Sequence, residues 1–498
     1  NMYANEKSDK TIVPEKLPNN EHLCSAEVME ERVLPKRNTS QTTAARTQSR
    51  DTALTGLAGV RQAAQRKKDV QFTALLHHVT VALLTQSFFS LKRNSAAGID
   101  GTTWHAYHDN LDENLSLLHD KLHSGRYRPQ PARRTMIPKA DGTQRPLSIL
   151  CLEDKIAQQA VVCVLEAIYE EDFLGFSYGF RPGRGQHNAL DALSVGIYRK
   201  RVNWVLDADI QKFFDTMNHD WILRFLEHRL GDKRLLRLIK AWIKAGVMEG
   251  NHRRKSNIGA PQGAVISPIL ANVYLHYVLD LWAQNWRCKS CRGDMMIIRY
   301  ADDSVFGFEY EDDAHRFLAE LRTRMNRFGL TIHPDKTNLI CFGKYAIGMR
   351  KNKGEGSPET FDFLGFTHYC TLSFKRKTFL IGRKTIRKRM RASLSVIKAQ
   401  LRKRWHDPLH KTGKWIRRIL QGHLNYFSVP GNDHSIWLFF GEVRRHWLKR
   451  IRRRSQRGFM SWEKFMRIIA PYFPKIRVTH PHPRQRFNVR TQGRSPVR

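Results

Sequence analysis

The chain has 498 residues and a mass of 58.1 kDa, enough for about three domains of ordinary size. Apolar residues make up 41% of it, so it can bury a core, but no stretch approaches the roughly 20 consecutive apolar residues that cross a bilayer. This excludes a membrane-embedded protein. Seven scattered cysteines and a polar start without an apolar run predict a reducing compartment and no secretory signal.

Positive charge is concentrated in the last quarter of the chain. The formal net charge is +39, and the isoelectric point is about 10.3. Residues 371–498 contain 34 Lys and Arg but only four Asp and Glu, a net charge of +30, whereas the first 370 residues contribute +9. A solvated surface usually mixes both signs, so this excess predicts a surface that binds nucleic acid.

The expected elements change character along the chain. Residues 1–69 are polar without sustained periodicity, which is typical of a flexible segment with at most short helices. An apolar stretch predicts a helix over 72–91, and a turn-rich loop follows at 95–101. Mixed α/β structure is expected from 136 to about 366. Strands are predicted at 203–210, 295–300 and 304–308, and helices at 153–170, 221–245 and 312–328.

After residue 386 the pattern becomes helical. Apolar residues recur every three or four positions over 386–401 and again over 436–451, with Lys and Arg on the other faces. With 415–424 between them, these stretches predict a three-helix unit with a basic exterior. From Pro471 the chain is rich in Pro and Arg and is expected to be irregular.

Three aspartates carry the expected chemistry. Asp302 and Asp303 are adjacent in the turn between two predicted strands, where like charges are unfavourable without a cation. Asp209 ends another strand, and the side chain of Asp207, two residues earlier, lies on the same face of that strand. Carboxylates suit Mg²⁺, and three of them on neighbouring strands would hold two ions about 4 Å apart for in-line phosphoryl transfer. The alternative, a solvated acidic turn, is less favoured because strands flank it.

Seven blocks of sequence resemble, in order, those of reverse transcriptases. Tyr300–Asp303 is similar to their Y-A-D-D box, and Asp209–Asp215 to their first palm motif. The best family match is the reverse transcriptase/maturase encoded within bacterial group II introns. Gly422–Phe427 and the Arg-rich helix after Ile436 resemble the thumb of that family. The other blocks are Ile137–Pro146, Phe176–Pro182, Ala260–Asn272, Gly329–Lys336 and Phe361–Gly365.

The resemblance implies an α+β fold of the right-hand polymerase type, with fingers, a palm with an antiparallel sheet, an α-helical thumb and a basic C-terminal extension. Some relatives carry a zinc-bound H-N-H endonuclease with paired C-x-x-C motifs, which is expected to be lacking because Cys370 is the last cysteine. The expected parts are a flexible segment 1–71, fingers 72–200, palm 201–371, a three-helix thumb or maturase domain 372–454 and a basic DNA- or RNA-binding region 455–498.

The resemblance also implies RNA-directed DNA synthesis, binding of the intron RNA to assist splicing, and intron mobility by target-primed reverse transcription. The implied partners are group II intron RNA, a DNA target and primer, and deoxynucleoside triphosphates, in the bacterial cytoplasm or nucleoid and without a membrane. Two alternatives stay open. One is a free-standing relative in host defence or repair; the other is a maturase that only binds RNA, which degraded carboxylates would mark.

Carried over to this sequence, the family's metal site places two Mg²⁺ ions on Asp209 and Asp302 beside the carbonyl of Ile210. Asp303 completes the carboxylate cluster, and Asp207 is interpreted as structural.

The family's nucleotide site places Phe214, five residues after Asp209, as a bulky sugar gate. A core position is the alternative, because Phe213 and Phe214 cannot both face the site. Gln262 with Gly263 would contact the template base pair. The incoming triphosphate would be bound by Lys139, Arg145 and Lys336.

Three further patterns lie outside the polymerase motifs. A zinc site at Cys288 and Cys291 is disfavoured, because one C-x-x-C supplies only two of four ligands. The segment His480–Arg484 is expected to be extended and to touch RNA or DNA. One exposed face of the thumb helix is predicted to bind RNA through Arg444, Arg445, Lys449 and Arg450.

Overall fold

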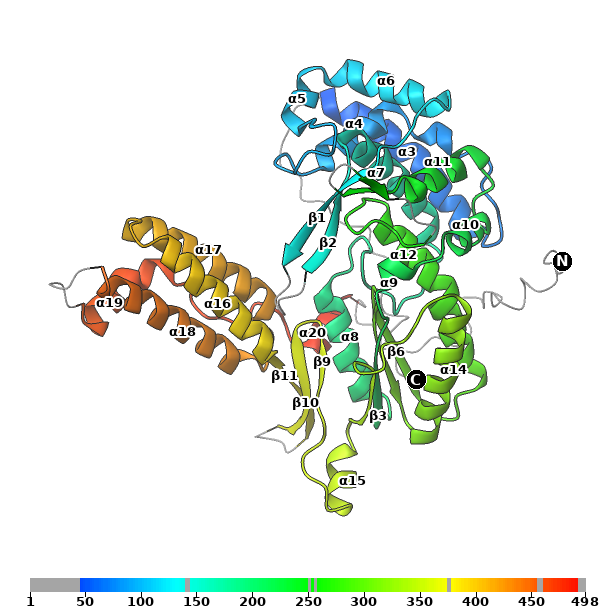
Figure 1. The fold of residues 1–498 in the computed structure, drawn as a ribbon. Coiled ribbons are helices and arrows are strands. Elements are labelled where there is room, and N and C mark those ends of the chain that lie inside the picture. Colours follow the sequence, from blue (N-terminus) through cyan, green and yellow to red (C-terminus); the bar gives the residue numbers. More distant parts are fainter. Residues whose placement is uncertain are drawn as a thin grey trace.

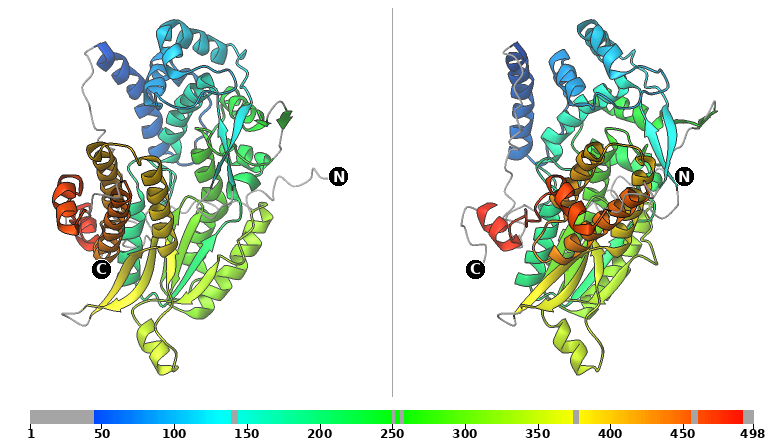
Figure 2. Two further views of the ribbon diagram at one scale, coloured as in Figure 1. Left: turned by 60° about the vertical axis from the view of Figure 1, so that its left-hand side comes forward. Right: turned by 90° about the vertical axis from the view of Figure 1, so that its left-hand side faces the viewer.

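The computed structural model describes residues 45–138, 144–249, 252–254, 258–373, 378–454 and 460–490. A helical upper part, a central sheet and an arm of helices make up the fold (Figure 1). Two further views show the arm standing alongside the central sheet, with α15 (Ala346–Asn352) projecting at the end opposite the upper helices (Figure 2). Within the described residues, no helix is both long and apolar enough to cross a membrane.

The upper part holds most of the residues predicted as fingers, together with α3 and the strands β4 and β5. A four-stranded sheet in the order β2-β1-β4-β5 lies beside the helices, and β1 and β2 form an antiparallel hairpin. Its helical elements are α3 (Ala45–Arg66), η1 (Leu76–His78), α4 (Val81–Ser90), α5 (Trp104–Asp109), α6 (Leu111–His123) and α7 (Leu152–Tyr169). Its strands are β1 (Ala132–Pro138), β2 (Gln144–Ile149), β4 (Val247–Glu249) and β5 (His252–Arg254).

Helix α3 differs from the expected flexible segment over 1–71. Leu57, Val60 and Ala64 are buried on one face of this helix, which packs against α7 and α4. A stripe of three apolar side chains is too short to stand out in a polar sequence, and it is stabilised by tertiary packing. Residues 1–44 of the predicted segment lie outside the described residues.

The central sheet runs in the order β6-β7-β3-β8, with antiparallel neighbours throughout. Helix α8 packs on one face through a core with Val205 and Val305, and α14 packs on the other through a core with Leu206 and Phe306. This alternation follows from the two-residue repeat of a strand. The elements are β3 (Trp204–Asp209), β6 (Met295–Tyr300), β7 (Asp303–Phe308), β8 (Asn338–Cys341), α8 (Gln186–Arg199) and α14 (Glu311–Arg327).

Two helical segments beside the sheet differ from simple expectations. The predicted helix 221–245 is two helices, because Gly231 and Asp232 break it and the Asp232 carboxylate caps the second one. The helix after Gly263 contains a π-helical turn, η2 (His276–Asp280). The helices are α9 (Phe213–Thr216), α10 (His219–Glu227), α11 (Lys233–Lys244), α12 (Ser267–Leu275) and α13 (Leu281–Lys289).

The arm begins with a small antiparallel sheet in the order β11-β10-β9. Three helices follow, and they share a core that includes Leu420, Phe440 and Trp447. The elements are β9 (Phe361–Phe363), β10 (Phe366–Leu372), β11 (Phe379–Thr385), α16 (Arg387–Lys403), α17 (Leu409–Phe427) and α18 (Asp433–Arg452).

The last described segment is not a separate extension. Helix α19 (Trp462–Ile469), followed by the turn η3 (Ala470–Tyr472), buries Phe465 and Ile469 in the core of the arm. Helix α20 (Pro483–Arg490) then packs on α8, where Arg486 lies 3.3 Å from a carboxylate oxygen of Asp191. The expected irregular chain after Pro471 therefore includes a helix that joins the arm to the central sheet.

Candidate active site

The register of the central sheet brings two of the predicted aspartates together. Asp209, the last residue of β3, lies directly opposite Asp303, the first residue of β7. Asp302 stands in the turn that joins β6 to β7. The ammonium Nζ of Lys336 lies 3.0 Å from Oδ2 of Asp209. The strand ends therefore form an acidic edge that one lysine already approaches.

Like charges raise the proton affinity of this edge. The pKa of Asp303 rises to about 7, because the surrounding protein desolvates the carboxylate and because Asp302 and Asp209 lie near it. The side chain still contacts solvent. Burial and the charges of Asp303, Asp209 and Asp362 likewise raise the pKa of Asp207 to about 7. A cation at this edge would relieve the repulsion.

The acidic edge fits Mg²⁺ by the chemistry of its donors. Among the residues that the structure describes, no group of three or more His, Cys, Asp or Glu side chains is arranged to hold a metal ion. The three-carboxylate cluster expected from the sequence is thus not assembled as a ready-made cage. Mg²⁺ commonly takes one or two carboxylates and completes its shell with water and substrate phosphates. Asp209 and Asp303 can supply such a pair, and the backbone of Ile210 lies beside them, bridged to Ile332.

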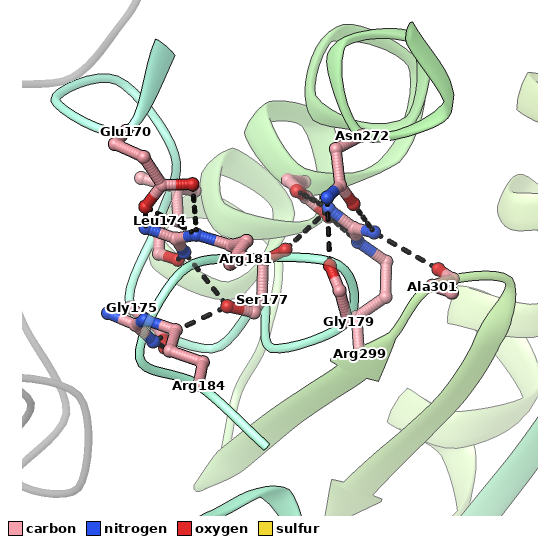
Figure 3. A network of polar contacts seen from close by, with 11 residues as sticks. Glu170, Leu174, Gly175, Ser177, Gly179, Arg181, Arg184, Asn272, Arg299 and Ala301 are labelled. Carbon is pink, nitrogen blue, oxygen red and sulfur yellow. Dashed lines mark hydrogen bonds and ion pairs between the residues drawn. The ribbon is translucent and has the colours of Figure 1, made fainter. Parts of the chain in front are cut away.

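A buried arginine holds the turn of the acidic edge (Figure 3). Arg299 is fully buried, and its guanidinium Nη1 donates to the carbonyl of Ala301 and to Oδ1 of Asn272, each at 3.0 Å. Nε and Nη2 donate to the two carboxylate oxygens of Asp280 at 2.6 Å each, and Nη2 also donates to Oγ of Ser177 at 2.7 Å. Ala301 has a φ of +57°, so this network fixes a backbone conformation that non-glycine residues rarely adopt.

Of the residues predicted to bind the nucleotide, Lys336 contacts the acidic edge directly. Phe213 is buried in the core, whereas Phe214 is half-buried and packs against the same core from outside. Nε2 of Gln262 donates to Oδ1 of Asp215 at 3.0 Å. Lys336 contacts Asp209, as described above.

The fingers hairpin reaches the same place through its backbone. The amide of Ser148 donates to the carbonyl of Gln262 at 2.6 Å. Gly263 has a φ of +107°, and a Cβ there would lie 2.6 Å from the carbonyl oxygen of Ser148, so only glycine permits this approach. Arg145 is placed by its backbone, paired with Ile137 in the hairpin. Lys139 lies outside the described residues.

The four cations predicted as one exposed face of α18 are divided by the structure. Arg445 and Lys449 are exposed. Arg444 stacks over the ring of Phe473 at 4.9 Å, and Arg450 over Trp405 at 5.0 Å. The four cations therefore do not form one uniformly exposed face, because Phe473, after η3, and Trp405, after α16, lie against two of them.

Two other predicted features have structural roles. The Cys291 thiol donates to the carbonyl of Gly293 at 3.1 Å, and the carboxylate of Asp313 accepts from the amides of Arg292 and Gly293, so a capped turn occupies the region of the C-x-x-C. The segment around His480 is anchored at one residue: the His480 ring stacks on His187 of α8 at 3.8 Å. Pro481, His482 and Arg484 remain exposed, so the expectation that the segment touches RNA or DNA stays a prediction.

Arg299, Asn272 and Arg389 belong to the site but were missed by sequence reasoning. Arg389, from α16, lies near enough to Asp303 to lower its proton affinity, which brings the arm to the acidic edge. Arg299 directly precedes the Y-A-D-D box, and an arginine within a run of apolar strand residues was the signal that could have found it.

Comparison with known proteins agrees with this geometry. A family profile described as reverse transcriptase (RNA-dependent DNA polymerase) matches residues 137–368. Protein YkfC of Escherichia coli is 38% identical over 306 residues, which cover 53% of this chain and 80% of that protein. The group II intron-encoded protein LtrA of Lactococcus lactis is 36% identical over 201 residues, covering 39% of this chain and 33% of LtrA.

A plant protein named nuclear intron maturase 3, mitochondrial, from Arabidopsis thaliana is 31% identical over 139 residues, covering 28% of this chain and 19% of its own length. The chain therefore spans four fifths of one relative but a third or less of these two intron proteins. The reverse transcriptase match implies a right-hand polymerase fold, which the mixed helix and sheet of the structure fit. The resemblance predicted from the seven sequence blocks is confirmed, and the chain belongs to the reverse transcriptase and maturase family of group II introns.

Proposed function

We propose that this chain is an RNA-directed DNA polymerase that also binds a group II intron RNA to assist its splicing and mobility. The observation that carries the proposal is the register of β3 and β7, which sets Asp209 opposite Asp303 beside the turn with Asp302. Neighbouring carboxylates at the end of a sheet support a nucleotidyl-transfer site. Family membership supports the same activity.

The carboxylates act by holding charge at a fixed point. Asp209 and Asp303, with Asp302, would hold two Mg²⁺ ions, and when bound these ions stabilise the charge on the attacking and leaving oxygens. The Arg299 network holds the backbone of the turn in one conformation, so the side chains of Asp302 and Asp303 project from a fixed point. Lys336, now paired with Asp209, is close enough to move to a triphosphate oxygen when metal takes its place.

Nucleotide and template would be selected beside the acidic edge. The half-buried ring of Phe214 would block a 2′-hydroxyl, and Gln262 with Gly263 would support the template base pair. Arg145, in β2 of the fingers hairpin, would bind the triphosphate.

Intron binding requires a different surface. The +30 charge of residues 371–498 supports binding of a large RNA, whose phosphates release counterions when they are neutralised. In this proposal the splicing chemistry belongs to the RNA, and the protein contributes binding energy in the bacterial cytoplasm or nucleoid. A DNA target would supply the primer for intron mobility.

Primer extension tests the proposed activity directly. The purified chain is expected to extend oligo(dT) on poly(rA) with dTTP and Mg²⁺, and Asp302→Ala is expected to abolish extension while retaining affinity for RNA. Asp312→Ala is the matched control, because Asp312 is an exposed carboxylate on α14, away from the acidic edge. Failure of the unchanged chain to extend the primer, or full activity of Asp302→Ala, would contradict the proposal.

A further inference from the structure

Phe180 combines two features that a folded protein usually avoids. Its side chain is 48% exposed, although it is a large apolar ring. Its φ is +59°, in the left-handed region that disfavours bulky residues. Glycine or asparagine would adopt this backbone conformation with less strain. A phenylalanine at this position therefore suggests a function for its ring.

The residues on both sides of Phe180 are fixed by close contacts with the active-site turn and the core (Figure 3). A Cβ on Gly179 would lie 2.2 Å from the amide nitrogen of Ala301, so the two backbones touch. Arg181 is buried, forms an ion pair with Glu170 at 2.9 Å and donates to the carbonyl of Ser177 at 2.8 Å. The backbone of Phe180 thus cannot relax without disturbing the acidic edge.

The ring of Phe180 reaches the predicted sugar gate. It meets the ring of Phe214 edge to face, with centroids 6.4 Å apart and an angle of 70° between the planes. On another side, Phe214 contacts the buried Phe213 at 5.4 Å. Phe214 therefore stands between a ring that the core holds and a ring that the loop of residues 177–181 holds.

We propose that Phe180 is a positioning residue that holds Phe214 in the orientation that rejects ribonucleotides. The inference rests on the proposed polymerase function and deepens it. With Phe180 in place, the Phe214 ring has a neighbour on its exposed side and stays in one rotamer. Without it, the ring can turn toward solvent and leave room for a 2′-hydroxyl. The loop of residues 177–181 touches the Y-A-D-D turn at Gly179, so the distance between the Phe214 ring and the carboxylates of that turn stays fixed.

The test is the ratio of kcat/KM for dTTP to that for UTP on poly(rA) primed with oligo(dT). Phe180→Gly removes the ring but suits the left-handed backbone, and Phe180→Ala removes it with the backbone strain kept. Both are expected to lower the ratio by about two- to tenfold, the usual worth of one aromatic pair. Phe180→Tyr keeps the ring and should retain the ratio. Tyr345→Ala, which truncates an exposed ring near α15, is the control.

Coupling between the two rings separates positioning from a general structural role. In a Phe214→Ala background, adding Phe180→Gly is expected to leave the ratio unchanged, because the gate that Phe180 orients is already gone. Equal further losses in both backgrounds would overturn the inference, as would an unchanged ratio in Phe180→Gly and Phe180→Ala.

The experiments distinguish failure of the proposed polymerase function from failure of the role proposed for Phe180. If the unchanged chain does not extend the primer, the polymerase proposal fails, and equilibrium binding of dTTP and UTP then decides on Phe180. A ratio of the two Kd values that is the same in the unchanged chain and in Phe180→Gly would overturn the role of Phe180 as well.

Discussion

The central sheet and the helical arm place charge in opposite ways. At the acidic edge of the sheet, strand register forces Asp209 and Asp303 together, at the cost of a raised pKa for Asp303. On the arm, cations are spread over the outside of the helices, and some, such as Arg444 over Phe473, also pack on rings. The sheet concentrates like charge at one point, whereas the arm distributes it.

This difference follows from what each region would bind. Phosphoryl transfer depends on positions within a fraction of an ångström, so the acidic edge is supported by the buried Arg299 network. Binding a large RNA depends on summed charge, which tolerates displacement of any single side chain. Substitutions at the acidic edge should therefore abolish primer extension almost completely. Substitutions of cations on the arm should weaken RNA binding step by step.

The largest expected effect separates two aspartates on one strand. Asp209→Asn should lower kcat/KM for primer extension by about 10²–10³-fold, because it removes a ligand for charge that develops in the transition state. Asp207→Asn should lower kcat/KM by less than about tenfold. Asp207 lies opposite Val305, two residues further along the sheet from the turn than Asp209 and Asp303. Steady-state extension rates measure both. Equal losses for the two variants would make Asp207 a member of the site rather than a structural residue.

Ion pairs offer a second contrast between the two regions. Arg299→Met should lower the free energy of unfolding by about 3–5 kcal/mol, because Asp280 is then left charged and buried. Arg445→Met removes the exposed pair with Glu442 and should cost less than about 1 kcal/mol. Urea denaturation measures the two values. The paired change Arg299→Met with Asp280→Leu should recover part of the loss, and no recovery would argue against an uncompensated charge as the cause.

The pH dependence of Mg²⁺ use should report on the acidic edge. Asp303 and Asp207 have pKa values of about 7 in the folded chain, well above the 3.8 of an aspartate in an unfolded chain. These two carboxyl groups thus bind more protons in the folded chain than in the unfolded one between these values, so their contribution to metal-free stability should fall as pH rises from about 4 to 7. Buried histidines such as His368, whose pKa burial lowers to about 3, contribute in the opposite direction. Mg²⁺ competes with these protons, so its half-saturating concentration should be lower at pH 8 than at pH 6. Titration of extension activity with Mg²⁺ measures this, and Asp303→Asn should weaken the dependence.

Much of the acidic edge could be predicted from sequence, because motif spacing and the two-residue repeat of strands determine which side chains share a face. The gate role of Phe214 was predicted only from its place in the family's motif, five residues after Asp209. Arg299, α3 and the docking of α20 on α8 could not be predicted, because each depends on contacts between distant segments. For Arg444 and Arg450, charge counting identified a basic region but could not tell which cations would lie over aromatic rings.

The smallest expected effect concerns α18 and divides its four cations into two matched pairs. Arg445→Gln with Lys449→Gln removes two exposed charges. The plot of log affinity for group II intron RNA against log salt should then flatten by roughly one unit per lost phosphate contact, with an unchanged melting temperature. Arg444→Gln with Arg450→Gln removes the same charge but also two stacking contacts. This pair should lower the melting temperature and change the salt slope less.

Salt titrations of RNA binding and thermal melts of the unchanged chain and both double variants complete the comparison. Primer extension on a short poly(rA)–oligo(dT) duplex should be nearly the same in the exposed-pair variant, because the acidic edge is untouched. Equal salt slopes in the two double variants would mean that position on α18 is irrelevant and that only net charge counts. An unchanged slope in the exposed-pair variant would place the RNA elsewhere on the arm, since a contacted phosphate must release counterions when its partner is present.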